Sequence, residues 1–129
     1  RAVEDPRLRE QDWGHYKEVE FLKRENAARK DYGKFYFRLA DGESGADVFD
    51  RISTFLETLH RDFRKNDYAD NTLIVTHGVT LMIFLMRWFH WTVEEYETYR
   101  NPQNAQVIVL ERAEKEHFSL ASMLLRSDA

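Results

Sequence analysis

Residues 73–80 place a histidine where an anion could be bound. A short β-branched run ends at His77 and Gly78, and an apolar segment with helical spacing follows at once. Phosphate groups bind where parallel strands end and helices begin, because unpaired backbone N–H groups and the positive end of the helix dipole meet there. A glycine at position 78 permits a tight turn and lets a ligand approach the backbone. From these residues alone, a phosphate site and a histidine that only hydrogen-bonds at a strand end are equally good interpretations.

Two other loops combine a carboxylate with glycine. Glu10 lies shortly before the pair Trp13-Gly14, and Glu43 and Ser44 lie between two glycines at the start of an expected helix. Together with the loop at His77 and Gly78, they make three polar loops spread along the chain. Helices and strands must bring these loops together if they share one site.

Apolar spacing predicts the helices that position these loops. A long helix is expected to begin in a capping box at residues 44–47 and to fade near residues 66–71. Its single apolar face has residues three or four apart, namely Val48, Ile52, Phe55, Leu59 and Phe63. A second helix is expected over residues 79–89, apolar almost all round and therefore buried on several sides. A short third helix opens at Thr92 by the same capping pattern, and Pro102 ends it.

Three strands are expected among and after these helices. Residues 72–76 and 106–110 are short β-branched runs, and residues 118–125 form a weaker strand that pairs back after a turn at 113–116. The order helix, strand, helix, helix, strand, strand is typical of an α/β fold.

Composition excludes several classes of function. A chain of 129 residues that is 43% hydrophobic suits one globular domain with a real core. The absence of cysteine excludes disulfides, thiolate zinc sites and cysteine nucleophiles, and it is compatible with a reducing compartment such as the cytoplasm. A net charge of −4 argues against general nucleic-acid binding. The longest apolar run, residues 81–86, is too short to cross a bilayer, so a soluble protein without a membrane partner is expected.

The remaining polar side chains are weaker candidates. Residues 16–40 hold seven Lys or Arg against four acids, a modest excess from which Arg38 is singled out as a contact for an anionic substrate. The triplet at residues 60–62 falls on the long helix, where neighbouring side chains point apart, and is expected at the surface. His90 and His117 have no partners at metal-ligand spacing, so no metal site is expected. The clustered aromatic residues are expected in the core or in a subunit contact.

The three polar loops, in their order and spacing, resemble landmarks of the histidine phosphatase superfamily, the phosphoglycerate-mutase-like phosphatases. Residues 35–48, an aromatic-Arg stretch before Gly42-Glu43-Ser44, are especially similar to a eukaryotic and microbial mutase-like branch. The resemblance implies a three-layer α/β sandwich around a mainly parallel central sheet. It also implies phosphoryl transfer from a small phosphomonoester through a phosphohistidine, without a metal or another cofactor.

The resemblance also implies a role for single residues. Glu10 matches the acid that protonates the leaving oxygen and then activates water or the accepting hydroxyl. His77 matches the histidine that binds the transferring phosphoryl group and stabilises its developing charge. Glu43 and Ser44 match a turn that shapes the pocket and caps a helix. Asn104 lies where the family brings a polar residue or a backbone amide near the phosphate.

One family landmark is missing from the sequence. The Arg-His-Gly motif, which supplies the nucleophilic histidine and a phosphate-clamping arginine, does not occur, and neither does the second arginine expected after the first strand. We therefore interpret residues 1–129 as the C-terminal portion of one histidine phosphatase domain that lacks its first strand, and we expect this portion alone to be inactive. Two alternatives stay open: an inactive relative that binds phosphorylated ligands, and a fragment that functions only beside its missing half. A sheet without its central strand exposes an edge, so pairing with the missing segment or with a second copy is a further expectation.

Overall fold

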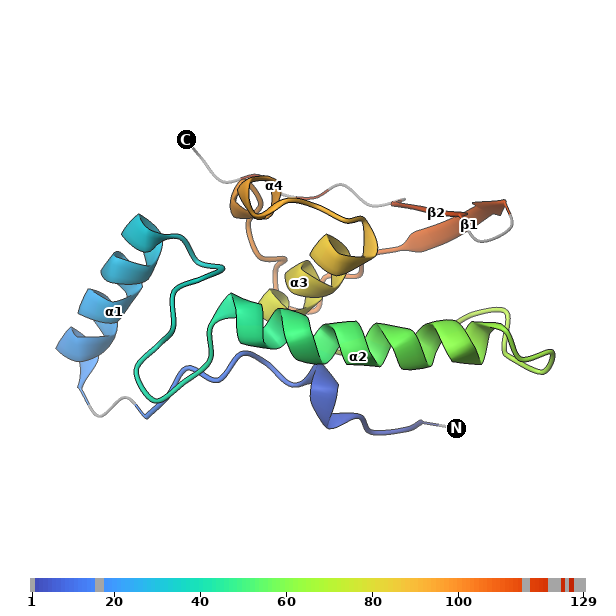
Figure 1. The fold of residues 1–129 in the computed structure, drawn as a ribbon, viewed down its shortest axis with the longest axis horizontal. Coiled ribbons are helices and arrows are strands. Elements are labelled where there is room, and N and C mark those ends of the chain that lie inside the picture. The colour runs from blue at the N-terminus through green and yellow to red at the C-terminus, as the bar shows by residue number, and fades with distance from the viewer. Residues whose placement is uncertain (1, 16–17, 115–116, 121–123, 125, 127–129) are drawn as a thin grey trace.

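A computed structural model describes residues 2–15, 18–114, 117–120, 124 and 126. Along the chain, the elements in Figure 1 are the 3₁₀ turn η1 (Pro6–Leu8), the helices α1 (Val19–Tyr32), α2 (Gly45–Phe63), α3 (Gly78–Trp88) and α4 (Val93–Glu97), and the strands β1 (Leu110–Glu114) and β2 (His117–Leu120).

Helix α2 is the longest element and agrees with the sequence prediction. The Ser44 hydroxyl accepts the Asp47 N–H at 3.2 Å, and Asp47 in return accepts the Ser44 N–H at 2.8 Å, so the predicted capping box is present. The predicted apolar face is buried at Val48, Ile52, Phe55 and Leu59 and partly buried at Phe63, and Leu56 is buried beside it. The helix ends at Phe63, shortly before the predicted polar turn.

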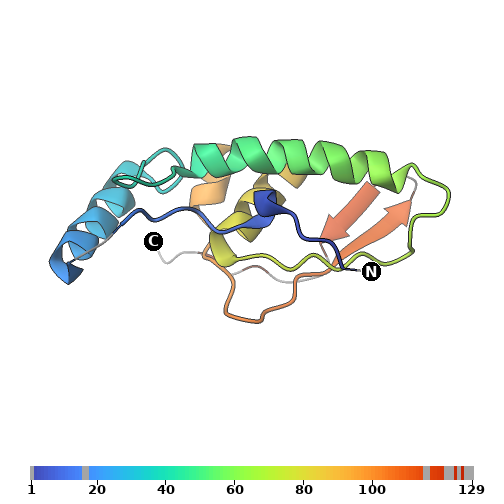
Figure 2. The same ribbon diagram turned by 90° about the horizontal axis from the view of Figure 1, so that it is seen from below.

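The core lies between α2 and α3. Five consecutive residues of α3, from Met82 to Met86, are buried, which confirms the prediction of a helix covered on several sides. Figure 2 shows α2 along one side of α3 and the N-terminal segment crossing in front of α3. The predicted third helix is confirmed as α4, and its N-cap Thr92 accepts the Glu95 N–H at 3.1 Å.

Helix α1 projects from the rest of the chain (Figure 1) and buries none of its residues. Side chains of α1 contact the loops beside α2, among them the Tyr32 ring, which lies 6.1 Å from the Phe37 ring. The Arg29 guanidinium lies 5.0 Å from the centre of the Trp13 ring, and Glu25 accepts the Ala40 N–H at 3.3 Å. Much of the basic stretch before residue 40 therefore lies on a helix that buries none of its residues.

The predicted mainly parallel sheet is not formed by the described residues. Their sheet has two strands, β1 and β2, which pair antiparallel with Leu110 opposite Leu120. The strand that pairs back is thus confirmed over His117–Leu120, whereas residues 121–123 and 125 lie outside the described residues. The turn predicted at 113–116 begins too early, because β1 runs to Glu114; residues 115–116 lie outside the description.

The strands predicted at 72–76 and 106–110 are extended chain that lies outside the described strands, apart from the start of β1 at Leu110. A strand needs the backbone groups of a neighbour, and the described part of the chain places none beside residues 73–75. Their side chains nevertheless alternate as in a sheet. Ile74 and Ile108 pack on the core, whereas four apolar side chains face outward with exposed fractions of 86%, 80%, 70% and 42%: Leu73, Val75, Val107 and Val109.

Candidate active site

The carboxylate of Glu10 lies at the N-terminus of α3. Its Oε1 accepts the Thr80 N–H at 3.0 Å, and its Oε2 accepts the Val79 N–H at 3.2 Å. These N–H groups belong to the first turn of the helix, where they have no partner inside the helix. The helix end that the sequence marked as an anion site therefore already holds an anion, the side chain of Glu10.

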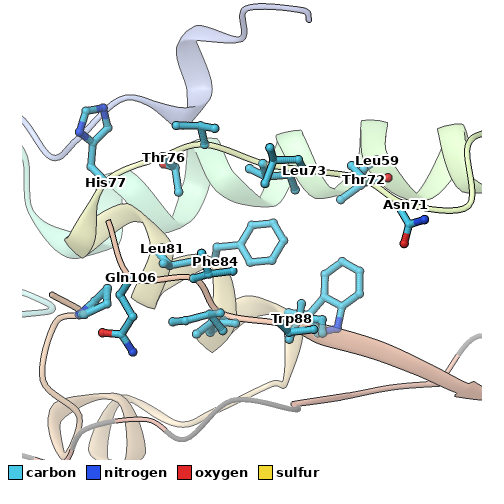
Figure 3. A pocket seen from close by; sticks show the side chains of 18 of the residues that line it. Leu59, Asn71, Thr72, Leu73, Thr76, His77, Leu81, Phe84, Trp88 and Gln106 are labelled. Atoms are coloured by element: carbon cyan, nitrogen blue, oxygen red, sulfur yellow. The ribbon is translucent and has the colours of Figure 1, made fainter. Parts of the chain in front are cut away.

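His77 occupies the N-cap position of α3, directly before the residues that bind Glu10. Its side chain makes no capping hydrogen bond, and the residue is exposed. In Figure 3 the imidazole projects away from the side chains of Leu81, Phe84 and Trp88. The ring is therefore open to a ligand and does not belong to the apolar core.

A groove of about 1230 Å³ opens between residues 71–77 and residues 102–109 (Figure 3). Apolar side chains of α2 and α3 line it, including Leu59, Phe63, Leu81, Phe84 and Trp88. Of the predicted site residues, Glu10, His77, Gly78 and Asn104 line this groove. Asn104 is exposed in the turn beside Ala105, which has a positive φ of 61°.

Arg38, Glu43 and Ser44 are not among the groove-lining residues. The Arg38 guanidinium lies 2.7 Å from the Asp47 carboxylate, and its side chain is 62% exposed. A hydrogen bond from the Ser44 N–H lowers the pKa of Asp47 against the opposing effect of burial, and Arg38 lowers it further. In the described structure Arg38 thus contacts the start of α2 and not the groove.

Glu43 holds the N-terminal segment against α2. One of its oxygens accepts the Asp12 N–H at 2.9 Å, and both contact the Arg51 guanidinium at 3.2 Å. Burial alone would raise the pKa of Glu43, but the bonds from Arg51 and Asp12 and the charges of Arg51 and Arg9 hold this pKa below its ordinary value. Glu43 is consequently an ionised structural partner, whereas Ser44 caps α2.

Arg51 is a site residue that no sequence pattern predicted. This arginine lies on α2, and its side chain is only 11% exposed. The only sequence signal for it is its place beside the buried Ile52, at the border of the apolar face. Its acceptors are three carbonyl oxygens of the N-terminal segment and the Glu43 carboxylate, none of which could be identified from that position.

The glycines needed for close packing are Gly14 and Gly42, not Gly78. A Cβ at Gly78 would lie 3.6 Å from the Asn101 Cβ, an ordinary contact, so the turn does not require glycine there. A Cβ at Gly42 would overlap the Asp12 carbonyl oxygen, and one at Gly14, where φ is +79°, would overlap the Ala40 carbonyl oxygen. These two glycines let the loops around Asp12 and Gly42 pack together.

The described residues offer neither a metal cluster nor a bilayer-spanning helix. Within them, no three His, Asp or Glu side chains gather in a way that could hold a metal ion. None of the described helices combines the length and the apolar character that a bilayer-spanning segment needs.

Known proteins share this sequence pattern. The model of the histidine phosphatase superfamily (branch 1) matches residues 1–123. The chain is 42% identical to the phosphoglycerate mutase-like protein AT74 of Arabidopsis thaliana over 124 residues, which are 92% of the chain and 39% of that protein. It is also 42% identical to the broad-range acid phosphatase DET1 of Saccharomyces cerevisiae over 114 residues, which are 86% of the chain and 34% of that protein.

No solved structure matches the chain significantly. The chain spans well under half the length of these two relatives. The family match covers all three polar loops, including Glu10, Glu43 and His77. The chain therefore belongs to the histidine phosphatase superfamily, whose members have an α/β, phosphoglycerate-mutase-like fold.

Proposed function

We propose that the intact protein transfers a phosphoryl group from a small phosphomonoester through a phosphohistidine intermediate. Membership of the superfamily supports phosphatase-type chemistry in general. The observation that carries the finer proposal is the meeting of Glu10 and His77 at the start of α3, beside the groove that both residues line. In this proposal Glu10 is the general acid and His77 is a ligand of the phosphoryl group.

The two side chains suit these roles for different reasons. The oxygens of Glu10 are held by the Val79 and Thr80 N–H groups, so the carboxyl group stays in one place while a proton moves to the leaving oxygen. The same group then takes a proton from the attacking water. The exposed imidazole of His77 can donate a hydrogen bond to a phosphoryl oxygen, where negative charge grows during transfer.

We further propose that a strand of the same polypeptide, preceding residue 1, fills the groove and carries the nucleophilic histidine. Residues 73–75 offer backbone groups that no described residue pairs, and the outward Leu73 and Val75 require a covering layer. A strand laid parallel to residues 72–76 would end beside His77. The greater length of the relatives supports this occupant, and the three-layer sandwich would then be complete.

The proposal is tested with the protein expressed from its complete reading frame. We expect His77→Ala to lower kcat for an aryl phosphate on the order of 10²–10³-fold, the usual effect of removing one donor to a developing oxyanion. The exposed His90, which does not line the groove, supplies the control His90→Ala with unchanged turnover. Equal activity of the two variants would refute the role of His77.

The role of Glu10 is tested with two leaving groups. Glu10→Gln keeps the shape of the side chain but cannot donate the proton. Turnover of an alkyl phosphate, whose leaving group needs protonation, should fall about 10²–10⁴-fold, whereas turnover of nitrophenyl phosphate should fall little. The alternative of a binding module without turnover predicts phosphate binding but no hydrolysis of either substrate by the wild-type protein.

A further inference from the structure

We propose that Arg51 is a positioning residue that holds the backbone of Glu10 in place and is not itself a phosphate ligand. This inference rests on the proposed role of Glu10 as the general acid. It begins from the hydrogen bonds of the guanidinium group, which joins α2 to the N-terminal segment and to Glu43.

All five N–H groups of the Arg51 guanidinium have acceptors. Nη1 donates to the carbonyl oxygens of Arg7 at 2.6 Å and Arg9 at 2.9 Å. Nη2 donates to the Glu10 carbonyl oxygen at 3.1 Å and to Glu43 Oε1 at 3.2 Å, and Nε donates to Glu43 Oε2 at 3.2 Å. No donor is left for a phosphate oxygen while this arrangement persists.

The charge of Arg51 is also already balanced. Its partner Glu43 is ionised and has a side-chain exposure of 17%, against 11% for Arg51 itself. An arginine that serves as a phosphate clamp must present its planar fork to the ligand. The guanidinium group of Arg51 instead faces the main chain and the Glu43 carboxylate.

The main chain of residues 7–10, which Arg51 binds from α2, is also bound from the opposite side by Thr76, just before α3, and by Thr80 in the first turn of α3. The Thr80 hydroxyl donates to the Arg9 carbonyl oxygen at 2.7 Å, and the Thr76 hydroxyl donates to the Leu8 carbonyl oxygen at 2.6 Å. The main chain before Glu10 is thus fixed between α2 and α3. Loss of Arg51 would release the α2 side and let the Glu10 carboxyl group drift from the Val79 and Thr80 N–H groups.

The test compares Arg51→Met and Arg51→Lys in the protein from the complete reading frame. We expect kcat for an alkyl phosphate to fall about tenfold or more in Arg51→Met and kcat for nitrophenyl phosphate to change less than about threefold, because only the alkoxide needs the acid. KM should stay within about twofold. Arg51→Lys keeps the charge opposite Glu43 but not the fork, so it should show the same contrast more weakly and carries the test if Arg51→Met fails to fold.

A double variant separates positioning from an independent contribution. Arg51→Met should not slow the alkyl reaction further when Glu10 is already replaced by Gln, because the same step is lost. Arg61, exposed on the same helix, supplies the control Arg61→Met with wild-type kinetics. A rise in KM with unchanged kcat, an equal loss on both substrates, or additive effects in the double variant would overturn the inference.

Hydrogen exchange gives a readout that does not need turnover. The amide protons of Val79 and Thr80 bond to Glu10, so their exchange should accelerate on the order of tenfold in Arg51→Met and not in Arg61→Met. Unchanged exchange at both amides would contradict the positioning role. If the wild-type protein hydrolyses no phosphomonoester, the proposed function fails, and the exchange measurement alone decides whether Arg51 positions Glu10.

Discussion

Replacement of Glu10 should destabilise the protein as well as slow its chemistry. The Glu10 carboxylate accepts the second and third backbone N–H groups of α3, a helix whose N-cap His77 offers no side-chain bond of its own. Glu10 therefore acts as the cap of α3 from a distant part of the chain. Its removal exposes two N–H groups at the end of the most buried helix of the core.

The magnitude follows from these contacts. Loss of a capping acceptor to alanine costs about 0.5–2 kcal/mol, and loss of a negative charge at a helix N-terminus costs about 0.3–1 kcal/mol. We therefore expect Glu10→Ala to lower the free energy of unfolding by about 1–3 kcal/mol. Glu10→Gln can keep an acceptor for Thr80 but loses the charge and the Val79 bond, so it should cost about half as much.

The assay is urea denaturation of the protein from the complete reading frame, followed by tryptophan fluorescence at low and high salt. Salt should reduce the charge-dependent part of the loss, so the difference between the Gln and Ala variants should change with ionic strength. Glu4→Ala, at an exposed acid in the same segment, is the matched control. An effect of Glu10→Ala below about 0.5 kcal/mol, or equal to that of Glu4→Ala, would refute the capping role.

Three further outcomes are expected from the described contacts. The folded pKa of Glu43 lies below its ordinary value of 4.5, so ionised Glu43 stabilises the fold above that pH. This stabilisation is lost as the pH falls through the folded pKa. In thermal melts between about pH 5 and pH 2, the Tm of Glu43→Gln should therefore fall less with decreasing pH than the Tm of the wild type. Ser44→Ala should cost about 1 kcal/mol in urea denaturation, because the capping box of α2 is lost. Ile83→Ala, in a fully buried position, should cost about 2–5 kcal/mol in the same assay, and a cost near zero would place Ile83 outside the core.

Helices α2, α3 and α4 were predictable because their signals are local, whereas α1 was not predicted. The Ser44 capping box and the three-to-four spacing that follows it predict α2 within a few residues, and the apolar run after Gly78 predicts α3. Such patterns depend on hydrogen bonds between residues three or four apart. A sequence that satisfies them forms the same helix in many surroundings.

The strands were only half predictable. The β-branched runs at residues 72–76 and 106–110 correctly indicated extended chain, but only the structure showed that one side alone lies on the core, at Ile74 and Ile108, while Leu73 and Val75 are exposed. Pairing is a property of two segments, however, and the described residues place no neighbour beside residues 73–75. A mainly parallel sheet therefore stays a prediction for the intact protein.

The site residues likewise divide into features set by local sequence and features set by contacts between distant segments. The sequence by itself determined which residues could do chemistry, namely a histidine before a helix and carboxylates in glycine loops, because residue type and local spacing are written in it. Only the tertiary structure decided that Glu10 caps a helix 69 residues further along the chain. It also decided that Arg51 binds the main chain at Glu10 and that Arg38 contacts the start of α2 instead of the groove. The physical reason is that hydrogen-bond partners distant in sequence are chosen by how the core packs, and packing depends on the whole chain.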